Sequence, residues 1–354
     1  MSYFDGAGRR GKRGIIPAVV FIFALLVVAM VPSPYVIERP GQSFNVMSDV
    51  SGAPVISSAD IDIYPSESRF DILTVSLVGN RDVGPTWLQV LTAWLDPAQS
   101  VVPMDEIFPP NLSAEEISAE SVAMMATSQQ DAVAAALVEL GYEVPRVIYI
   151  STVYEDAPAS GKLIAGDFIR SVAGVEVVDL DQLKDEIQKS NGAPIDVVVT
   201  RDGSPVSLSV TPELRDESWV FGILVGYSYD FPVNVELQLG QVGGPSGGMM
   251  FALGIIDALT EGSLAGSNHI AGTGTIAASG EVGPIGGIRL KMIAAERSGA
   301  NLFIGPRDNC SEIVGNIPND LDVVVVENLD QALAVVNQLQ KQSEVGQEFR
   351  CSTN

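Results

Sequence analysis

The sequence is poor in histidine, cysteine and positive charge. His269 is the only histidine among 354 residues, which excludes a metal site built on several imidazole ligands. The two cysteines, Cys310 and Cys351, form no C-x-x-C pattern, so zinc ribbons and thioredoxin-like sites are also excluded. No G-x-x-x-x-G-K-[S/T] motif is present, so the residues indicate no nucleotide, and we expect no cofactor and no metal.

Acidic residues greatly outnumber basic ones. The chain has 44 Asp and Glu against 20 Lys and Arg, a formal net charge of −24. Such a charge repels phosphates, so no nucleic-acid partner is expected. The hydrophobic content of 46% is sufficient for real cores, and the length allows about two folded domains.

Four basic residues between positions 9 and 13 precede an uncharged apolar run, Ile15 to Val31. This pattern predicts a basic cytoplasmic tail over residues 1–14 and a single transmembrane helix over 15–32. The protein would then lie at the cell membrane with its catalytic domain extracytoplasmic. A cleaved signal peptide has the same layout, but no clear A-x-A site follows the run. An outside location permits a Cys310–Cys351 disulfide, and two free buried thiols are the alternative.

The middle of the chain changes from helical to strand periodicity at about residue 141. Ser113 and Glu116 form a capping box before a helix over 113–140. Other expected elements are strands at 71–78, 146–153, 195–200 and 206–210, and helices within 84–99 and at 180–189, the last with Asp181 as its N-cap.

Residues 157–169 contain Ala-Pro-Ala, then Gly-Lys-Leu, then Gly166-Asp167-Phe168-Ile169. With the later strand–Arg-Asp-Gly–strand pattern, this stretch resembles a PDZ domain spanning about 125–213. The resemblance implies binding of extended peptides by strand addition. By analogy, the carboxylate-binding loop would lie near Gly141 and Tyr142. The alternative is that the glycines of this stretch are only turn residues.

A glycine-rich turn, Gly243-Gly-Pro-Ser-Gly-Gly248, leads directly into an apolar helix. Ser246 would therefore be exposed at a helix N-terminus, where backbone groups at Gly244 and Gly247 could stabilise an oxyanion or contact substrate backbone. Taken alone, the turn could also bind phosphate or be purely structural.

The second informative stretch contains Thr273-Gly and, further on, Pro284-Ile-Gly-Gly-Ile-Arg-Leu-Lys291. Together with the glycine-rich turn, it resembles the proteolytic domain of Lon proteases. The resemblance implies Ser246 as nucleophile, Lys291 as general base and Thr273 as support for the lysine. It also implies a homo-oligomer.

Four positions depart from the family pattern. They are Gly243 for Asp, Gly247 for Ala, Thr275 for Glu and Arg289 for the first lysine of its block. None of them removes the serine or the second lysine.

A serine–lysine pair is chemically reasonable here. A serine hydroxyl needs a base, and His269 matches no base of the family, which makes it a packing or surface histidine. A lysine can serve if burial lowers its pKa to about 7–8. The apolar neighbours Leu290 and Met292 favour burial of Lys291. The alternatives are an exposed helix lysine and a serine that only caps its helix.

We therefore expect an α+β protein with an N-terminal transmembrane helix, a PDZ-like β domain and a Lon-type α/β proteolytic domain. Its expected activity is that of an ATP-independent serine endopeptidase, a hydrolase that cleaves exported or membrane-associated proteins. The rival is a membrane-tethered PDZ adaptor with an inactive Lon-like scaffold. The expected parts are 1–14, 15–32, a strand/helix region at 33–124 that packs with the later domains, 125–213, 219–345 and a C-terminal tail at 346–354.

Overall fold

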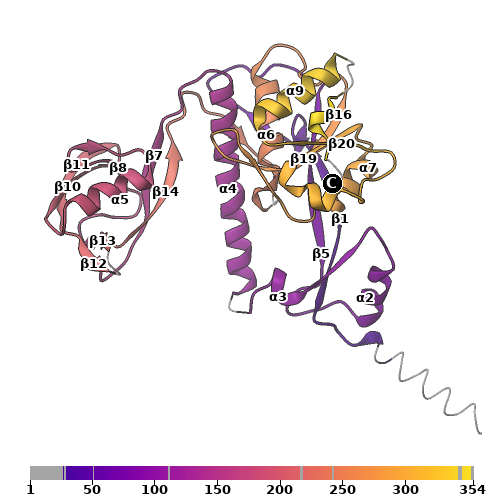
Figure 1. Ribbon diagram of the computed structural model, residues 1–354, viewed down its shortest axis with the longest axis horizontal. Coiled ribbons are helices and arrows are strands. Elements are labelled where there is room, and N and C mark those ends of the chain that lie inside the picture. Colours follow the sequence, from indigo (N-terminus) through magenta and orange to yellow (C-terminus); the bar gives the residue numbers. More distant parts are fainter. Residues whose placement is uncertain are drawn as a thin grey trace, which may run out of the picture. The chain divides into compact units, whose positions relative to one another are not determined.

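The computed structural model describes residues 27–351 except 28, 51, 111, 216–217, 241–242 and 342–344. The predicted tail 1–14 and most of the predicted helix 15–32 lie outside these residues. Within the described part, no helix is both long and apolar enough to cross a membrane. The chain divides into two compact units (Figure 1): unit 1 combines the residues up to Ala135 with those from Val235, and unit 2 is Ala136–Asn234.

Unit 1 is built on a six-stranded sheet in the order β20-β19-β16-β5-β1-β6. The four strands from β20 to β5 are parallel, whereas β1 and β6 are antiparallel to their neighbours. The strands are β1 Tyr35–Asn45, β5 Arg69–Val78, β6 Ser100–Pro103, β16 His269–Gly272, β19 Leu302–Pro306 and β20 Asp322–Val326.

Helices cover both faces of this sheet. On one face, α7 packs on Leu73, Ala271 and Phe303. On the other face α6 lies so close that a Cβ on Gly272 would meet Met250. The helices of unit 1 are α2 Trp87–Trp94, α3 Met104–Ile107, α4 Ala114–Glu139 (shared with the start of unit 2), α6 Gly248–Leu259, α7 Ile288–Ser298, α8 Cys310–Ile313 and α9 Leu329–Gln340.

Short elements complete unit 1. Three two-stranded ribbons pair β2 Asp49–Val50 with β3 Ala53–Pro54, β4 Ile56–Ser57 with β15 Glu236–Leu237, and β17 Thr275–Ile276 with β18 Val282–Gly283. The 3₁₀ turns are η1 Pro245–Gly247, η2 Arg307–Asn309 and η3 Gln347–Phe349.

The sheet joins parts of the chain that are nearly 200 residues apart. Strand β5 pairs in parallel with β16, with Phe70 opposite Ile270 and both side chains buried. Strands β1, β5 and β6, which fall in the predicted 33–124 region, thus share one core with strands of the predicted 219–345 domain. The reason is that the apolar run of β5 is buried and needs a strand on each side.

Unit 2 has its own sheet and core. The sheet order is β11-β10-β8-β7-β14, with β9 beside β8. Unit 2 extends beyond the predicted 125–213 boundary because β14 pairs along the whole of β7. Its elements are β7 Arg146–Val153, β8 Phe168–Val172, β9 Val175–Glu176, α5 Leu180–Lys189, β10 Ile195–Arg201, β11 Ser204–Val210, β12 Glu213–Arg215, β13 Ser218–Val220 and β14 Ile223–Tyr229.

One ion pair joins the Gly166-Asp167 segment to the Arg-Asp-Gly turn that begins at Arg201. Asp167 is fully buried, and Arg201 donates to both of its carboxylate oxygens at 2.7 Å. Burial alone raises the pKa of Asp167, but the hydrogen bonds from Arg201 and from the Ile164 N–H outweigh it and hold the pKa below its usual value.

Most expected helices and strands are confirmed, including the Ser113–Glu116 capping box. One cap is wrong. Asp179, rather than Asp181, accepts the N–H of Gln182 and begins α5, because Asp179 alone has the extended backbone of an N-cap residue.

Candidate active site

Ser246 lies in η1, at the entrance to α6. Gly244 precedes it with a φ of +86°, a conformation that glycine adopts without strain. The turn then runs directly into α6, whose residues are almost all buried. A buried helix therefore fixes the backbone of the serine.

The two residues that follow β16, Thr273 and Gly274, also hold this turn. The N–H of Gly274 donates to the carbonyl of Ser246 at 2.8 Å, and the N–H of Met249 donates to the carbonyl of Gly274 at 3.1 Å. The Thr273 hydroxyl donates to the same Ser246 carbonyl at 2.9 Å. The Thr-Gly segment and the Ser turn are thus bound into one rigid structure.

The structure brings Lys291 to Ser246. Lys291 lies in α7, its Nζ is 2.7 Å from Ser246 Oγ and 2.9 Å from Thr273 Oγ1, and only 3% of the residue is exposed. The three residues that the sequence singled out, Ser246, Lys291 and Thr273, therefore form one hydrogen-bonded group.

Burial sets the charge of the lysine. Removal of the ammonium from water lowers the pKa of Lys291 to about 8, against 10.5 for a free lysine. A substantial fraction of Lys291 is then neutral near pH 8 and can accept a proton from the serine hydroxyl.

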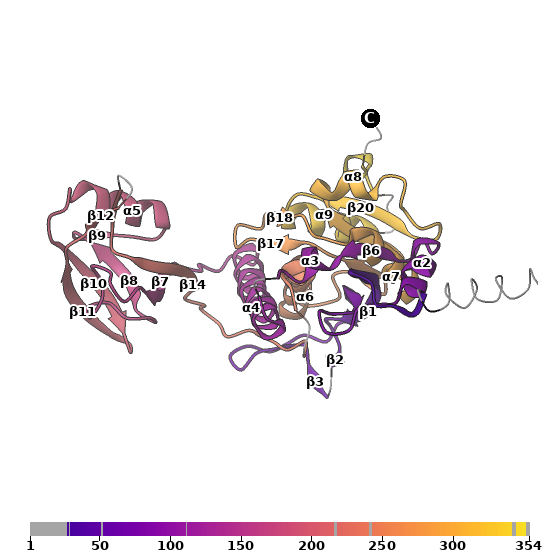
Figure 2. The same ribbon diagram turned by 90° about the horizontal axis from the view of Figure 1, so that it is seen from below.

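Helix α4 holds the turn as well, through two serines that the sequence analysis missed. Ser121 accepts the N–H of Gly244 through its carbonyl at 3.1 Å, and the Ser128 hydroxyl donates to the carbonyl of Pro245 at 2.8 Å. Figure 2 shows α4 alongside α6. Ser121 acts through its backbone carbonyl, so no residue type in the sequence signals this contact.

The same helix explains the departure at Gly243. A Cβ at this position would lie 2.2 Å from the Ser121 hydroxyl oxygen, so an aspartate would require the Ser121 side chain to move. Gly247 is similarly confined, since its Cβ would meet Ile72 at 3.1 Å.

One of the two expected backbone donors already has a partner within the protein. The N–H of Gly244 is already bonded to Ser121, so it is not available to an oxyanion. Ser246 is the second residue of the 3₁₀ turn, and its N–H has no acceptor within the turn. The Ser246 N–H is therefore the better donor, and the role of Gly247 stays a prediction.

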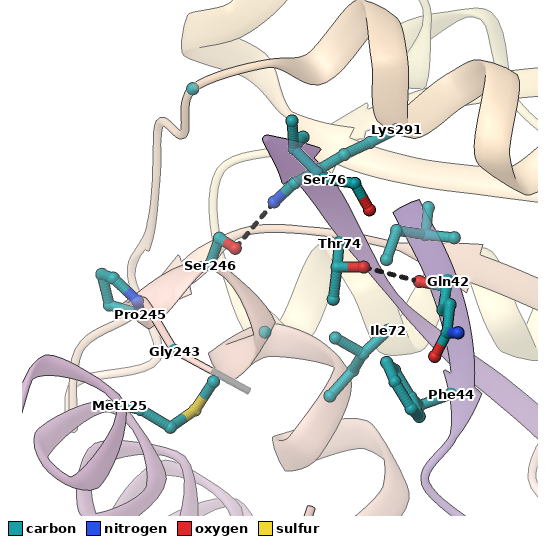
Figure 3. A pocket seen from close by; sticks show the side chains of 14 residues that line it. Gln42, Phe44, Ile72, Thr74, Ser76, Met125, Gly243, Pro245, Ser246 and Lys291 are labelled. Atoms are coloured by element: carbon teal, nitrogen blue, oxygen red, sulfur yellow. Dashed lines mark hydrogen bonds between the residues drawn. The ribbon is translucent and has the colours of Figure 1, made fainter. Parts of the chain in front are cut away.

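A cavity of about 570 Å³ opens beside Ser246 (Figure 3). Gln42, Thr74 and Ser76 give one part of its wall polar groups, whereas Phe44, Ile72 and Met125 form an apolar part. These residues belong to β1, β5 and α4, so the cavity wall comes largely from the N-terminal part of the chain.

Two residues position the segment before Lys291. Buried Asn309 exchanges hydrogen bonds with both the N–H and the carbonyl of Ile285, at 3.0 and 2.9 Å. Arg289, at the family's first lysine position, donates to the carbonyls of Pro97 and Gln99. Arg289 therefore ties α7 to the segment between α2 and β6.

His269 has a different partner. Its Nε2 lies 2.8 Å from buried Asp71, which Arg69 also binds. Burial raises the pKa of Asp71, but these hydrogen bonds dominate and hold it below the usual value. His269 thus serves a structural ion cluster, and within the described residues no three His, Cys, Asp or Glu side chains could hold a metal.

In unit 2, Gly141 and Tyr142 follow α4 and precede β7. Strand β7 is hydrogen-bonded on both sides, to β8 and β14. The sheet ends at β11 on one side and at β14 on the other, so an added strand could lie beside either of these two edge strands. Phe221 and Gly222 lead into β14. The expected carboxylate loop at Gly141 and Tyr142 therefore precedes a strand that has no free edge.

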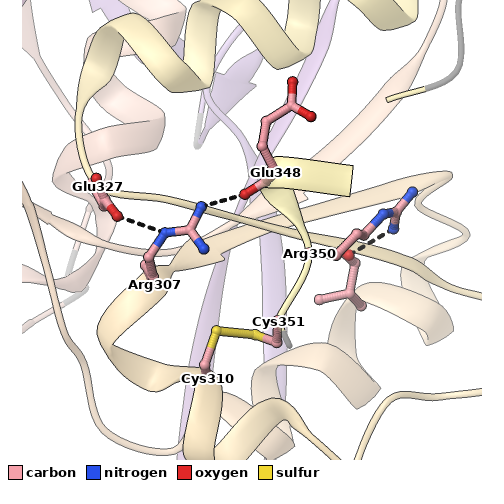
Figure 4. Close-up of a disulfide and its surroundings, with 7 residues drawn as sticks. Arg307, Cys310, Glu327, Glu348, Arg350 and Cys351 are labelled. Atoms are coloured by element: carbon pink, nitrogen blue, oxygen red, sulfur yellow. Dashed lines mark hydrogen bonds and ion pairs between the residues drawn. A yellow bond between two sulfur atoms is a disulfide. The ribbon is translucent and has the colours of Figure 1, made fainter. Parts of the chain in front are cut away.

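Cys310 and Cys351 form a disulfide with a Cα–Cα distance of 5.5 Å (Figure 4). It joins the first residue of α8 to the C-terminal segment. Arg307 donates to the Glu348 carbonyl at 2.6 Å, and Arg350 donates to the Val323 carbonyl at 2.7 Å. Part of the predicted tail 346–354 is therefore attached to the sheet of unit 1.

Residues 233–338 match the family model of the Lon protease (S16) C-terminal proteolytic domain. The chain is 32% identical over 138 residues to the Lon protease of Nitratidesulfovibrio vulgaris, covering 38% of this chain and 17% of that protein. It is 38% identical over 109 residues to the Lon protease of Vibrio parahaemolyticus, covering 30% of this chain and 14% of that protein. The chain thus spans less than a fifth of the length of either relative.

Solved PDZ domains are similar to a smaller part of the chain. The PDZ domain of the SdrC-like protein from Listeria innocua has 24% sequence identity and a TM-score of 0.21, covering 22% of this chain and 92% of that domain. This TM-score is low, and the fold of unit 2 is described by its own strand order, β11-β10-β8-β7-β14. The serine turn and the lysine helix both fall within residues 233–338, the region that is similar to the Lon protease (S16) C-terminal proteolytic domain.

Proposed function

We propose that this chain is an ATP-independent serine endopeptidase with Ser246 as nucleophile and Lys291 as general base. The observation that carries the proposal is the 2.7 Å contact between Lys291 Nζ and Ser246 Oγ, with a lysine buried enough to lose its proton near pH 8. Thr273 is the positioning residue, because it contacts Lys291 and the Ser246 carbonyl at once.

The reaction follows from these positions. Neutral Lys291 takes the hydroxyl proton as Ser246 Oγ attacks the carbonyl carbon of a peptide bond, and the Ser246 N–H stabilises the oxyanion. The lysine then gives its proton to the leaving amine, which leaves an acyl-serine. A water molecule, deprotonated by Lys291, attacks that ester and releases the acid product.

Substrates are proposed to be extended segments of proteins. The cavity beside Ser246 has an apolar part formed by Phe44, Ile72 and Met125, which suits an apolar side chain next to the cleaved bond. The uncharged run from Ile15 to Val31, behind four basic residues, supports a membrane anchor with the catalytic unit outside. Exported or membrane-associated proteins would then be the available substrates, and a homo-oligomer is the expected assembly.

The test is cleavage of an unfolded protein without ATP. Ser246→Ala should abolish cleavage and leave the circular dichroism spectrum unchanged, because Ser246 acts through its hydroxyl while its backbone bonds remain. Cleavage that persists in Ser246→Ala would contradict the proposal. A wild type with no cleavage of any substrate would favour the adaptor with an inactive scaffold.

Unit 2 is proposed to hold part of the substrate as an added strand on β14. Strands β11 and β14 are the two edges of the sheet, and β14 is favoured because α5 lies close to it: the Leu180 N–H donates to the Tyr227 hydroxyl at 2.9 Å. Strand addition supplies backbone hydrogen bonds, and nearby side chains supply the selectivity.

Two exposed leucines of unit 2 give a matched comparison. Leu224 lies on β14 and Leu214 on β12, with 53% and 55% of each residue exposed. Leu224→Asp should weaken peptide binding in a fluorescence-anisotropy titration, whereas Leu214→Asp should not. Equal effects of the two changes would contradict a site on β14.

A further inference from the structure

Helix α2 is apolar around most of its circumference, although it lies on the surface of unit 1. Its inner side packs through Val90 and Ala93 against the cluster with Ile37 and Val101. The next part of the surface is also apolar but exposed, and it consists of Leu88, Leu91, Trp94 and Leu95, which are 47–79% exposed. A helix that is hydrophobic on both sides is expected to bury both sides against apolar partners.

No charge interrupts this surface. Residues 83–95 contain no Asp, Glu, Lys or Arg, in a chain with a net charge of −24. Trp94 is held in place by an edge contact with the ring of Tyr35, at 6.3 Å between centroids, while 58% of it stays exposed. A fixed, uncharged surface that contains tryptophan suits the boundary between lipid headgroups and acyl chains.

The chain itself indicates which partner lies there. The uncharged run that starts at Ile15 ends at Val31, and the carbonyl of Val31 accepts the N–H of Trp87, the first residue of α2. Pro32 forms a bridge with Thr86, and the N–H of Ser33 donates to the carbonyl of Pro85 at 2.8 Å. Met30 and Val31 are themselves 67% and 46% exposed. The proposed anchor therefore leaves the bilayer directly beside the apolar side of α2.

We propose that Leu88, Leu91 and Trp94 of α2 and the following Leu95, with Met30 and Val31, form a lipid-contact surface that rests in the membrane interface. This inference rests on the proposed membrane anchor. The surface would add hydrophobic contact with lipid to the anchor and hold unit 1 close to the bilayer. A second protein copy is a poorer fit, since these six residues are far fewer than the roughly 20–30 that each partner gives to a standard interface.

The experiment places one environment-sensitive fluorophore on the surface of the full-length chain. The only two cysteines are joined in the disulfide, so an introduced cysteine is the single thiol to label. Leu91→Cys reports on α2. Ile63→Cys is the matched control, because it is exposed and precedes Arg69 at the start of β5, whereas α2 lies near the far end of that strand.

Each labelled chain is mixed with phosphatidylcholine vesicles, some of which carry a spin label near the headgroup. Flotation with the vesicles reports the anchor separately from the surface. The expected result is flotation of both chains, with loss of most of the fluorescence at position 91 and almost none at position 63.

Three outcomes would overturn the proposal. Iodide in solution serves as a second quencher. If both chains float, but the fluorophore at position 91 is quenched by iodide and not by the lipid spin label, the anchor proposal holds and the lipid-contact surface is contradicted. If position 91 is protected from both quenchers, another protein surface covers α2. If neither chain floats, the anchor itself fails and the lipid-contact surface fails with it, while the protease proposal is unaffected.

Discussion

At the scale of single residues, the site depends on one lysine that is almost fully buried beside a serine. Within the described residues, Lys291 Nζ has no carboxylate partner and contacts the hydroxyls of Ser246 and Thr273. No opposite charge therefore offsets the cost of burying the ammonium, and the pKa of Lys291 falls to about 8. The same burial that disfavours the ammonium makes Lys291 a usable base.

The pH dependence follows from the direction of this shift. Lys291 is protonated and inactive below its pKa, so kcat/KM should rise tenfold per pH unit at low pH and level off above about pH 8. Lys291→Arg should show no such rise and almost no activity, because an arginine stays charged. Lys341→Met, which changes an exposed lysine of α9's C-terminus, is the control. A wild-type profile that is flat from pH 6 to 9 would contradict the role of Lys291.

The sequence predicted the pair Ser246 and Lys291 through the resemblance of two short motifs to the Lon proteolytic domain. It could not predict that the Gly244 N–H is bonded to Ser121, since Ser121 lies more than a hundred positions away. It also could not predict the partner of His269, which is Asp71 on β5. Contacts between distant segments leave little trace in local pattern.

At the scale of elements, α4 is the support that a Lon-type motif alone does not reveal. Its residues Ser121 and Ser128 bind the backbone of Gly244 and Pro245 on the side away from β16. The nucleophile turn is thus held between a helix and a strand end. Such a turn loses little conformational entropy when substrate binds.

A double-mutant cycle can measure this support. Gly243→Ala should lower the free energy of unfolding by roughly 1–3 kcal/mol, because its Cβ would lie 2.2 Å from Ser121 Oγ. Ser121→Ala should cost less and should recover part of the loss in the double variant, since it removes the clashing oxygen. Chemical denaturation checks both values. Strict additivity of the two changes would contradict the contact between Gly243 and α4.

The secondary structure could be predicted well where periodicity is strong. The capping box of α4, strand β7 and helix α5 all follow from local residue types. The pairing of β5 with β16 could not, because the order of strands in a sheet depends on which apolar faces meet after the chain has folded.

At the scale of the whole molecule, unit 1 is discontinuous in sequence, with unit 2 inserted between its two halves. The disulfide adds a covalent connection within unit 1, between α8 and the C-terminal segment. Cys310 follows Asn309, which holds Ile285 near the lysine helix. The C-terminal segment is therefore part of the framework around the site.

Loss of the disulfide should be measurable as loss of stability. Cys351→Ser should lower the free energy of unfolding by roughly 2–4 kcal/mol, because the crosslink restricts the unfolded chain over a separation of 41 residues. Thermal unfolding with and without a reductant checks this. In the variant with both cysteines changed to serine, the reductant should not change the unfolding temperature. A wild type that is equally insensitive would show that the bond adds nothing to stability.

The sequence by itself determined the chemistry: one serine turn, one lysine motif, a single unmatched histidine and an uncharged N-terminal run. These are local properties, set by residue type and spacing. Only the tertiary structure decided that β1, β5 and α4 line the cavity beside Ser246, and that α2 keeps an apolar side exposed. The reason is that burial and strand pairing are settled between segments far apart in the chain, and no short stretch of sequence encodes them.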